Sequence, residues 1–233
     1  MAPASQAEEA RRGPLSRKVI AEAAMRLVDR EGLPLLTMRR LGSALQVEAM
    51  SLYGYFTTKE EILNEVVDLL FQEVTLPREN PDWEQFSREL FSGFRRVLLS
   101  HPNAVPLLVG RSPRSQPALA PIEASLGSLR HAGFDAATAL DGHGALMSFT
   151  VGYLLQEVGR LNEANVDPDS WGTGFYGLSD LTSADTPHLL ELAPVALQRE
   201  ADDQFSIGLT LVLTGLKMRL DAQRPATGSR PCP

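Results

Sequence analysis

The stretch that decides the fold runs from residue 37 to residue 59 and reads TMRRLGSALQVEAMSLYGYFTTK. Thr37 is a good helix N-cap, because its hydroxyl can accept a hydrogen bond from a free backbone N–H. Leu41 and Leu45 then lie on one side of a helix of about two turns. A further short helix is expected over residues 48–56. The stretch therefore predicts two short helices that follow each other closely.

Helical patterns also flank this stretch on both sides. Upstream, apolar residues from Ile20 to Val28 recur at the spacing of one helix face, and Gly32 follows as a C-terminal stop. Downstream, residues 58–61 (TKEE) have the spacing of a capping box, which predicts a helix running to about Gln72. Together the patterns indicate three short helices and one longer one.

The rest of the chain has apolar residues at helical spacing and no convincing strand alternation. Helices are expected from residue 86 to about 101 and over residues 105–109, 119–132, 135–162 and 201–223. Between the last two, residues 164–187 form a connection longer than loops usually are, and its aromatic residues from Trp171 to Tyr176 suit a lid or surface packing equally well. The predicted fold class is all-α, with about nine to ten helices.

The helical patterns divide the chain into two predicted domains. Residues 15–62 form the head, which holds the short helices, and residues 63–223 form the body. Residues 1–14 and 224–233 are expected to be disordered segments at the two ends. A length of 233 residues suits one small domain and one of ordinary size.

Charge is distributed unevenly between these domains. The chain as a whole has a net charge of −7, which by itself argues against a nucleic-acid partner. Residues 11–59, however, contain nine Lys or Arg and four Asp or Glu, a balance of +5, so the remainder carries −12. A basic head joined to an acidic body is expected if the head meets duplex DNA.

Several features of the head together closely resemble the TetR family of transcriptional regulators. They are a long first helix that ends in glycine, the Leu36-Thr37 pair, the Ser51-Leu52-Tyr53-x-x-Phe56 pattern, and Lys59 three residues further on. In the body, residues 101–102, 132–134 and 205–216 resemble the Tet-repressor type of C-terminal domain. The resemblance implies a helix-turn-helix head that binds DNA, and a helical body that binds an effector and dimerises.

The shape of the duplex and the resemblance both indicate which head residues contact DNA. A recognition helix in the major groove reaches base edges with its N-terminal residues, here 48–51, while Tyr53 and Tyr55 can reach phosphate oxygens. The resemblance places Arg39 at the DNA, where it could read a guanine through two hydrogen bonds. The predicted DNA-binding residues are Thr37, Arg39, Glu48, Ala49, Met50, Ser51, Tyr53, Gly54, Tyr55 and Lys59.

Two positions of the head depart from the family pattern. Gln46 stands where the family commonly has glycine, which would strain the turn, and Gly54 stands where a large residue is common. Readout is therefore expected to rely on Arg39, Met50 and Tyr55. The basic residues at the start of the chain form either a solvated face or an arm that contacts the minor groove or phosphates, and we favour the arm. These residues are Arg11, Arg12, Arg17 and Lys18.

For the body, the resemblance implies a ligand pocket in each subunit and dimerisation through the long eighth helix and the last helix. The last helix is apolar on nearly all sides, which independently favours burial at a subunit interface. The predicted interface residues are Phe205, Leu209, Val212, Leu213 and Leu216. The predicted pocket residues are Phe86, Phe94, His101, Leu108, Met147 and Tyr153.

Other roles stay open for several pocket residues. Phe86, Phe94 and Met147 can be ordinary core, and the two lone histidines of this region, His101 among them, can be structural. Tet repressor binds a drug–magnesium complex through a histidine at the position where Leu108 falls in this chain. Metal-tetracycline binding is therefore not expected.

The remaining signals argue against several classes of function. The sequence contains no Gly-rich phosphate loop, paired catalytic acids or nucleophile motif, so no enzyme, cofactor or metal site is predicted. The single cysteine, Cys232, fits a reducing cytoplasm. The uncharged part of the last helix, residues 204–216, is thirteen residues long, short of the roughly 20 needed to cross a membrane.

The sequence as a whole predicts a cytoplasmic, homodimeric one-component transcriptional regulator. It would be a repressor that binds a palindromic double-stranded DNA operator and is released by a small apolar effector. The alternative is a ligand-binding or protein-interaction module of the same fold that has lost operator binding, which Gln46 and Gly54 make conceivable. A salt-dependent DNA-binding assay separates the two.

Overall fold

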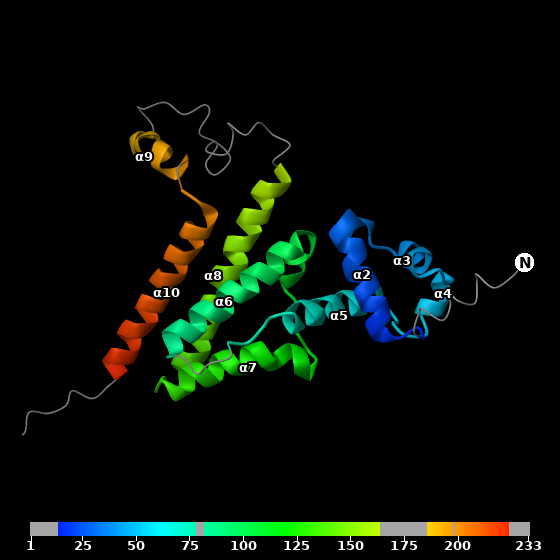
Figure 1. Cartoon of the computed structure of the whole chain (residues 1–233), viewed down its shortest axis with the longest axis horizontal. Coiled ribbons are helices and arrows are strands. Elements are labelled where there is room, and N and C mark those ends of the chain that lie inside the picture. Colours follow the sequence, from blue (N-terminus) through cyan, green and yellow to red (C-terminus); the bar gives the residue numbers. More distant parts are fainter. Residues whose placement is uncertain (1–13, 78–81, 164–185, 198, 224–233) are drawn as a thin grey trace, which may run out of the picture. The chain divides into compact units, whose positions relative to one another are not determined.

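The computed structural model describes residues 14–77, 82–163, 186–197 and 199–223 (Figure 1). The elements in these ranges are α2 (Arg17–Glu31), η1 (Leu33–Leu35), α3 (Met38–Leu45), α4 (Ala49–Leu52), α5 (Lys59–Gln72), α6 (Trp83–Ser100), η2 (Pro102–Leu108), α7 (Gln116–His131), α8 (Ala136–Glu163), α9 (Pro187–Leu197) and α10 (Ala201–Gln223). All are helices, and no strand occurs in the described ranges, so the all-α prediction is confirmed. The two ends of the chain and the aromatic connection at residues 171–176 lie outside the described residues.

The chain folds as two compact units, each built from two separate stretches. The first unit comprises Met1–Glu73 and His101–Leu119, and the second comprises Val74–Ser100 and Ala120–Pro233. The boundary suggested by the sequence after residue 62 falls inside α5, which belongs wholly to the first unit. The stretch 37–59 therefore lies in the first unit, and α10 lies in the second.

The caps and the stop that the sequence predicted for α2, α3 and α5 are present in the first unit. Thr37 caps α3 and Thr58 caps α5, each through a hydroxyl that accepts a hydrogen bond from the backbone N–H three residues later, at 3.2 and 3.3 Å. Glu61 reaches back so that its carboxylate accepts a hydrogen bond from the Thr57 N–H at 2.8 Å. Gly32 ends α2 with φ at 83°, a conformation that glycine adopts without steric cost.

The core of the first unit lies around α2, which packs against α3, α5 and η2. The apolar face that the sequence assigned to α2 is buried, from Ile20 to Val28. Each large apolar side chain fully removed from water contributes roughly 1.5–3 kcal/mol to stability. The fully buried partners from the other elements include Leu36, Leu41, Leu52, Phe56, Ile62, Val66 and Leu70.

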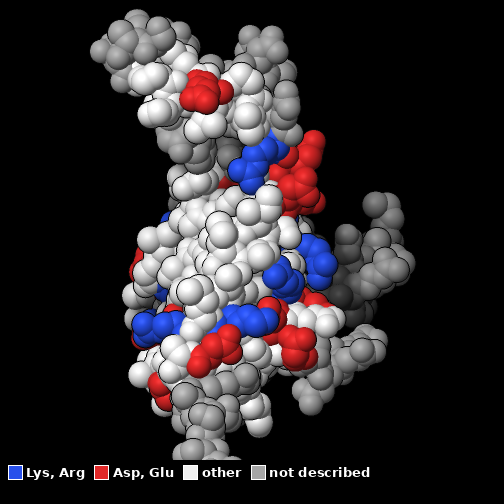
Figure 2. Space-filling model, turned by 90° about the vertical axis from the view of Figure 1, so that its left-hand side faces the viewer, with Lys and Arg blue, Asp and Glu red and all other residues white. Residues whose placement is uncertain are grey.

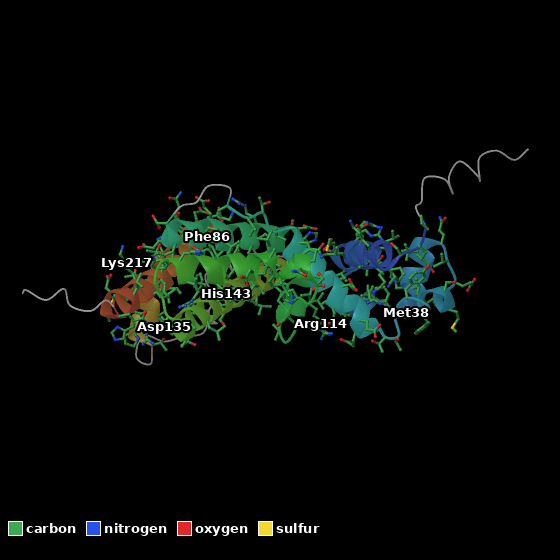
Figure 3. All side chains as sticks on the ribbon, turned by 90° about the horizontal axis from the view of Figure 1, so that it is seen from below. Met38, Phe86, Arg114, Asp135, His143 and Lys217 are labelled. Atoms are coloured by element: carbon green, nitrogen blue, oxygen red, sulfur yellow. The ribbon has the colours of Figure 1, made fainter. Side chains whose placement is uncertain are left out.

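Polar contacts fix residues 101–115 onto the helices of the first unit. The buried carboxylate of Asp68, on α5, accepts hydrogen bonds from the backbone N–H groups of Arg114 and Ser115 at 2.7 and 2.9 Å, just before α7 begins. Arg114 is labelled in Figure 3. The side-chain amide of Asn103 donates to the carbonyl of Asp29 on α2 at 2.9 Å. The Asp68 contacts satisfy two backbone donors just before α7, and the Asn103 contact ties η2 to α2.

The core of the second unit lies where α8 packs against α6 and α10. Its buried side chains include Leu90, Phe91, Phe94, Leu98, Leu146, Leu154, Phe205, Leu209 and Leu213. Gly208 allows the close approach of α8, because a Cβ there would lie 2.5 Å from two ring carbons of Phe149. Within one chain α10 buries a single face, although its sequence is apolar on nearly all sides.

A buried ion pair ties α6 to α8 inside this core. The guanidinium of Arg95 donates to both carboxylate oxygens of Glu157, at 2.5 and 3.0 Å, and both side chains are about nine-tenths buried. Arg95 also donates to Asp202 at 2.7 Å, and its guanidinium carbon lies 5.1 Å from the centre of the Phe205 ring. Burial lowers the pKa of Arg95, but its hydrogen bonds to the two carboxylates outweigh burial and raise it overall. Arg95 therefore stays charged.

Candidate nucleic-acid interface

A tight turn at Gln46 joins α3 to α4. Gln46 adopts the left-handed conformation, with φ 58° and ψ 40°, and is the one non-glycine residue with positive φ in the described part of the chain. The turn is closed by hydrogen bonds from the Gln46 N–H to the Ser43 carbonyl at 3.2 Å and from the Val47 N–H to the Gly42 carbonyl at 2.9 Å. The strain predicted for Gln46 agrees with this backbone conformation, which favours glycine.

Gly42 holds α3 and α4 close together, a role that the sequence analysis missed. A Cβ on this residue would lie 2.8 Å from the Val47 carbonyl oxygen and 3.2 Å from both the backbone nitrogen and the Cα of Ala49. Those are backbone atoms of the turn and of the first residue of α4, so they cannot move aside as a flexible side chain would. A glycine four residues before the turn was the available signal.

α4 is shorter than the helix expected over residues 48–56. It covers Ala49–Leu52, and the carbonyl of Leu52 then accepts from the N–H groups of both Tyr55 and Phe56 at 3.0 Å. Gly54, a poor helix former, lies in the turn that results. The turn brings Phe56 back into the core, where it is fully buried.

The surface of α4 and the following turn is rich in exposed side chains. Met50 is 76% exposed, Tyr53 48% and Tyr55 37%, while Leu52 and Phe56 are fully buried beneath them. The other predicted contact residues also lie at the surface of the first unit. Thr37, Arg39, Glu48, Ser51 and Gly54 are exposed, and Ala49 and Lys59 are half-buried. Met38, labelled in Figure 3, marks the beginning of the neighbouring helix α3.

The two adjacent arginines of α3 differ in their partners. Arg40 forms an ion pair with Glu31 at 2.7 Å, which ties α3 to the end of α2. Arg39 has no ion pair or hydrogen bond with any described residue, and its side chain is exposed. A free guanidinium beside α4 can meet a base edge or a phosphate without first breaking a contact.

The predicted basic arm is not supported at Arg17. The Arg17 guanidinium turns inward, donating to the Tyr55 carbonyl and to the carboxylate of Glu65, because partners within the first unit satisfy it. Lys18 remains exposed, with Glu22 at 3.9 Å. Arg11 and Arg12 lie outside the described residues.

The predicted pocket residues fall into both units. Phe86 and Phe94 on α6 and Met147 and Tyr153 on α8 belong to the second unit, where Phe94 is buried in the core and the other three are half-buried (Figure 3 labels Phe86). The Tyr153 hydroxyl donates to the Ala201 carbonyl at 2.7 Å, so its polar group is already used inside the unit. Leu108, half-buried in η2, and His101 belong to the first unit.

His101 has the surroundings of a structural histidine. Its two ring nitrogens lie 2.9 Å from a carboxylate oxygen of Asp29 and 3.0 Å from one of Glu73. Burial lowers the pKa of His101, but hydrogen bonds and charge attraction from the two carboxylates outweigh burial and raise it overall. A charged imidazole with both N–H groups bonded links α2 to the end of α5, which favours the structural alternative left open by the sequence.

One cavity of about 360 Å³ lies between α6 and α10 within the second unit. Its lining is mixed: charged and hydroxyl side chains such as Arg88, Glu89 and Ser206 lie beside the apolar Leu76, Pro77 and Leu209. None of the predicted pocket residues lines this cavity. The Arg88 guanidinium already donates to the Thr210 hydroxyl at 2.7 Å.

The predicted dimer-interface residues of α10 are largely buried within a single chain. Phe205, Leu209, Leu213 and Leu216 are buried inside their own subunit, and Val212 is half-buried. A helix that is apolar on nearly all sides gives no sequence signal to distinguish its two faces. The large apolar side chains of α8 and α10 that are exposed are Leu140 of α8 and Ile207, Leu211 and Met218 of α10. Figure 2 shows a wide uncharged area on the face of the second unit that carries α10.

Membrane-spanning helices and metal-binding side-chain clusters are both absent from the described residues. None of the described helices is both long and apolar enough to cross a membrane. Within the same ranges, no group of three or more His, Cys, Asp or Glu side chains could hold a metal ion.

Comparison with known families covers most of the chain. Residues 20–66 match the family described as bacterial regulatory proteins, tetR family. Residues 76–220 match the family described as tetracyclin repressor-like, C-terminal domain. The chain belongs to the TetR family of transcriptional regulators. The resemblance seen in the sequence is therefore confirmed, and this TetR-family chain belongs with regulators, which are generally not enzymes.

Individual TetR-family relatives agree with this assignment. An HTH-type transcriptional regulator of Saccharopolyspora erythraea is 37% identical over 144 residues, which are 61% of either chain. The Escherichia coli tetracycline repressor protein class C is 29% identical over 210 residues, 88% of this chain and 93% of the repressor. Apo ActR from Streptomyces coelicolor has a TM-score of 0.79 and 26% identity, covering 91% of this chain and 100% of ActR.

Proposed function

We propose that the chain is a cytoplasmic repressor that binds a palindromic operator as a homodimer and leaves it when a small apolar effector binds. The observation that carries this proposal is the exposure pattern of α4 and the turn after it. Met50, Tyr53 and Tyr55 face solvent, while Leu52 and Phe56 anchor the same segment in the core. A short helix held on one side and bare on the other can enter the major groove as a rigid element.

In this proposal each exposed group of the first unit has a defined role at the DNA. Glu48, Ala49, Met50 and Ser51 lie at the beginning of α4 and meet base edges. The hydroxyls of Tyr53 and Tyr55 bind phosphates, as does Lys59 at the beginning of α5, where the helix dipole also favours an anion. The predicted contacts Thr37, Arg39 and Gly54 complete the surface, and Arg39 is the strongest candidate for guanine.

Dimerisation is supported by uncovered apolar side chains on the second unit. Ile207 is 49% exposed, Leu140 61%, and Leu211 and Met218 are each 69% exposed. Large apolar side chains gathered on one face usually mark a surface that another protein covers. A twofold-related copy would cover this face, and it would need to hold the two α4 helices about 34–36 Å apart to meet successive major grooves.

An effector of the small-molecule class is supported by what the solved relatives contain. ActR has been solved in complex with actinorhodin and in complex with (S)-DNPA, at 27% identity to this chain in both cases. For this chain we propose an apolar effector bound by the second unit, where half-buried Phe86 and Met147 are the first candidate contacts. Such a ligand releases DNA only by binding the DNA-incompetent arrangement more tightly than the competent one.

The alternative, a module that has lost operator binding, has less support. It rested on Gln46 and Gly54. Gln46 adopts the left-handed conformation and both hydrogen bonds of the turn are formed, so the departure does not open the α3–α4 turn. Gly54 lies after the end of α4, where a glycine is compatible with the turn that returns Phe56 to the core.

DNA binding is tested by selecting duplexes from a random-sequence pool with the purified chain. The expected result is enrichment of a palindrome with half-sites about one helical turn apart, whose affinity falls steeply as salt increases. Failure to enrich any sequence above the random pool contradicts the operator-binding proposal.

Dimerisation is tested by sedimentation of the Leu211→Glu variant. A charge on the exposed face of α10 should convert the dimer to a folded monomer, because the carboxylate would be buried without a partner. The matched control is Val109→Glu, at an apolar position of the first unit that is 61% exposed and lies outside the proposed interface. A monomeric unaltered protein, or an unchanged dimer for Leu211→Glu, contradicts the proposed interface.

A further inference from the structure

The first residue of α2, Arg17, joins three elements of the first unit. Its Nη1 donates to the carbonyl oxygen of Tyr55 at 2.5 Å. Its Nε and Nη2 donate to one carboxylate oxygen of Glu65, on α5, at 3.1 and 2.8 Å. Its guanidinium carbon lies 4.1 Å from the centre of the Phe56 ring, within the range of a cation–π contact.

These contacts converge on the segment through which the chain leaves the recognition helix α4. Tyr55 presents its side chain to solvent, while its carbonyl is held by Arg17. Phe56 is fully buried, and its N–H donates to the last residue of α4, Leu52, at 3.0 Å. A group that fixes the Tyr55 carbonyl and the Phe56 ring therefore fixes the C-terminal end of α4 relative to α2 and α5.

The chemistry of the contact requires arginine. The guanidinium is planar and has five N–H donors in a fixed fork, so one group can stack on a ring, pair with a carboxylate and donate to a carbonyl together. A lysine ammonium is a compact point charge that can reach Glu65 but cannot also stack and span to the carbonyl. The side chain of Arg17 is 49% exposed and that of Glu65 32%, so a surface ion pair between them would contribute little by itself.

We propose that Arg17, held by Glu65, is a positioning residue for DNA recognition: it sets the orientation of α4 and does not contact phosphate. The proposal rests on the DNA-binding function of the family. It predicts that breaking the contact harms recognition of a specific sequence more than it harms general attraction to DNA. The competing role, a basic arm on the phosphate backbone, would require the guanidinium to leave both Glu65 and the Tyr55 carbonyl.

Two substitutions separate positioning from phosphate contact. Arg17→Lys keeps the charge and loses the three-way contact, and we expect it to weaken binding to a duplex selected by the unaltered protein about tenfold or more, as for loss of a charge-assisted hydrogen bond. Glu65→Gln removes a negative charge from the head, which by simple electrostatics should strengthen DNA binding. The positioning role predicts the opposite sign, a loss of about threefold to tenfold.

The measurements are operator affinity over a range of salt, affinity for a scrambled duplex, and the midpoint of thermal unfolding. We expect both variants to keep the slope of log K against log salt and to keep scrambled-duplex affinity within about twofold, because no phosphate contact is lost. A role confined to stability would lower the unfolding midpoint and leave the affinity of the folded protein unchanged. Arg26→Lys is the matched control, the same swap at an exposed position of α2 outside the predicted contact residues, and should bind as the unaltered protein does.

Three outcomes overturn the proposal. The first is normal binding of the selected duplex by Arg17→Lys, and the second is tighter binding of it by Glu65→Gln. The third concerns a further variant, Arg17→Gln: a salt slope lowered by about 0.9 would mean that one phosphate contact had been lost. If Arg17→Lys fails to fold, Glu65→Gln decides alone, since its predicted sign is opposite under the two roles. If the unaltered protein selects no duplex, operator binding itself fails, an outcome distinct from the three above.

Discussion

The close approach of α3 and α4 makes Gly42→Ala a sharp test of the turn geometry. The added Cβ would lie 2.8 Å from the Val47 carbonyl oxygen, and relief requires a shift of several tenths of an ångström in the turn or in α4. Overpacking of this kind costs about 1–3 kcal/mol. Replacing a helical glycine with alanine returns about 1 kcal/mol of helix propensity. We therefore expect net destabilisation of up to about 2 kcal/mol.

The displacement should affect recognition more than stability, because Ala49 is the first residue of α4 and any relief moves the recognition helix. The assay is urea unfolding followed by circular dichroism, combined with titration of a selected duplex at fixed salt. Gly127→Ala is the matched control, since this glycine lies inside α7 in the second unit and no atom would lie within 4 Å of its added Cβ. If Gly42→Ala proves as stable as the unaltered protein and binds DNA equally well, the reasoning about the α3–α4 contact is refuted.

Further predictions concern three other sites. Arg39→Ala should weaken binding to the selected duplex by about 1–3 kcal/mol with no change in unfolding midpoint, measured by gel shift and thermal denaturation, because the side chain has no intramolecular partner among the described residues. His101→Gln should lower the free energy of unfolding most below about pH 6.5, where histidine is protonated even in the unfolded chain. The difference from the unaltered protein should shrink as pH rises through the raised pKa of the folded state. Urea unfolding at several pH values measures this, and a difference that does not change with pH contradicts it. Glu157→Gln should destabilise the second unit by about 3–5 kcal/mol, because it removes the buried carboxylate partner of Arg95 and leaves only the exposed Asp202. Asp202→Asn, at an 85% exposed side chain, should change the unfolding free energy by less than about 1 kcal/mol. Equal effects of the two changes in chemical denaturation would contradict this difference in burial.

Features encoded in short stretches of sequence were predicted well. The caps at Thr37 and Thr58, the stop at Gly32 and the buried face of α2 each depend on residues within a few positions of one another. The same holds for the surface around α4, because the buried Leu52 and Phe56 and the exposed residues 53–55 between them lie in one short segment. Local hydrogen-bonding capacity and apolar spacing were sufficient for these elements.

Features that depend on distant residues were predicted poorly. The Arg17 guanidinium bonds to residues 38 and 48 positions away in the sequence, so its inward orientation could not be read from a run of basic residues. The burial of one face of α10 depends on packing against α8, and a helix with apolar residues all round offers no periodic signal for that choice. His101 gained its two carboxylate partners in the same way, from α2 and from the end of α5.

The carboxylate of Asp68 beneath the start of α7 also limits how this regulator can be taken apart. Asp68 on α5 accepts from the backbone of the two residues just before α7, and His101 and Asn103 are bonded to α2. The DNA-binding piece is therefore completed by a segment that returns from later in the chain. A chimera made by a single cut after Glu73 would separate that piece from residues 101–119. Transplanting a new sensor onto this reader of DNA therefore calls for two junctions, with the returning segment kept from the original chain.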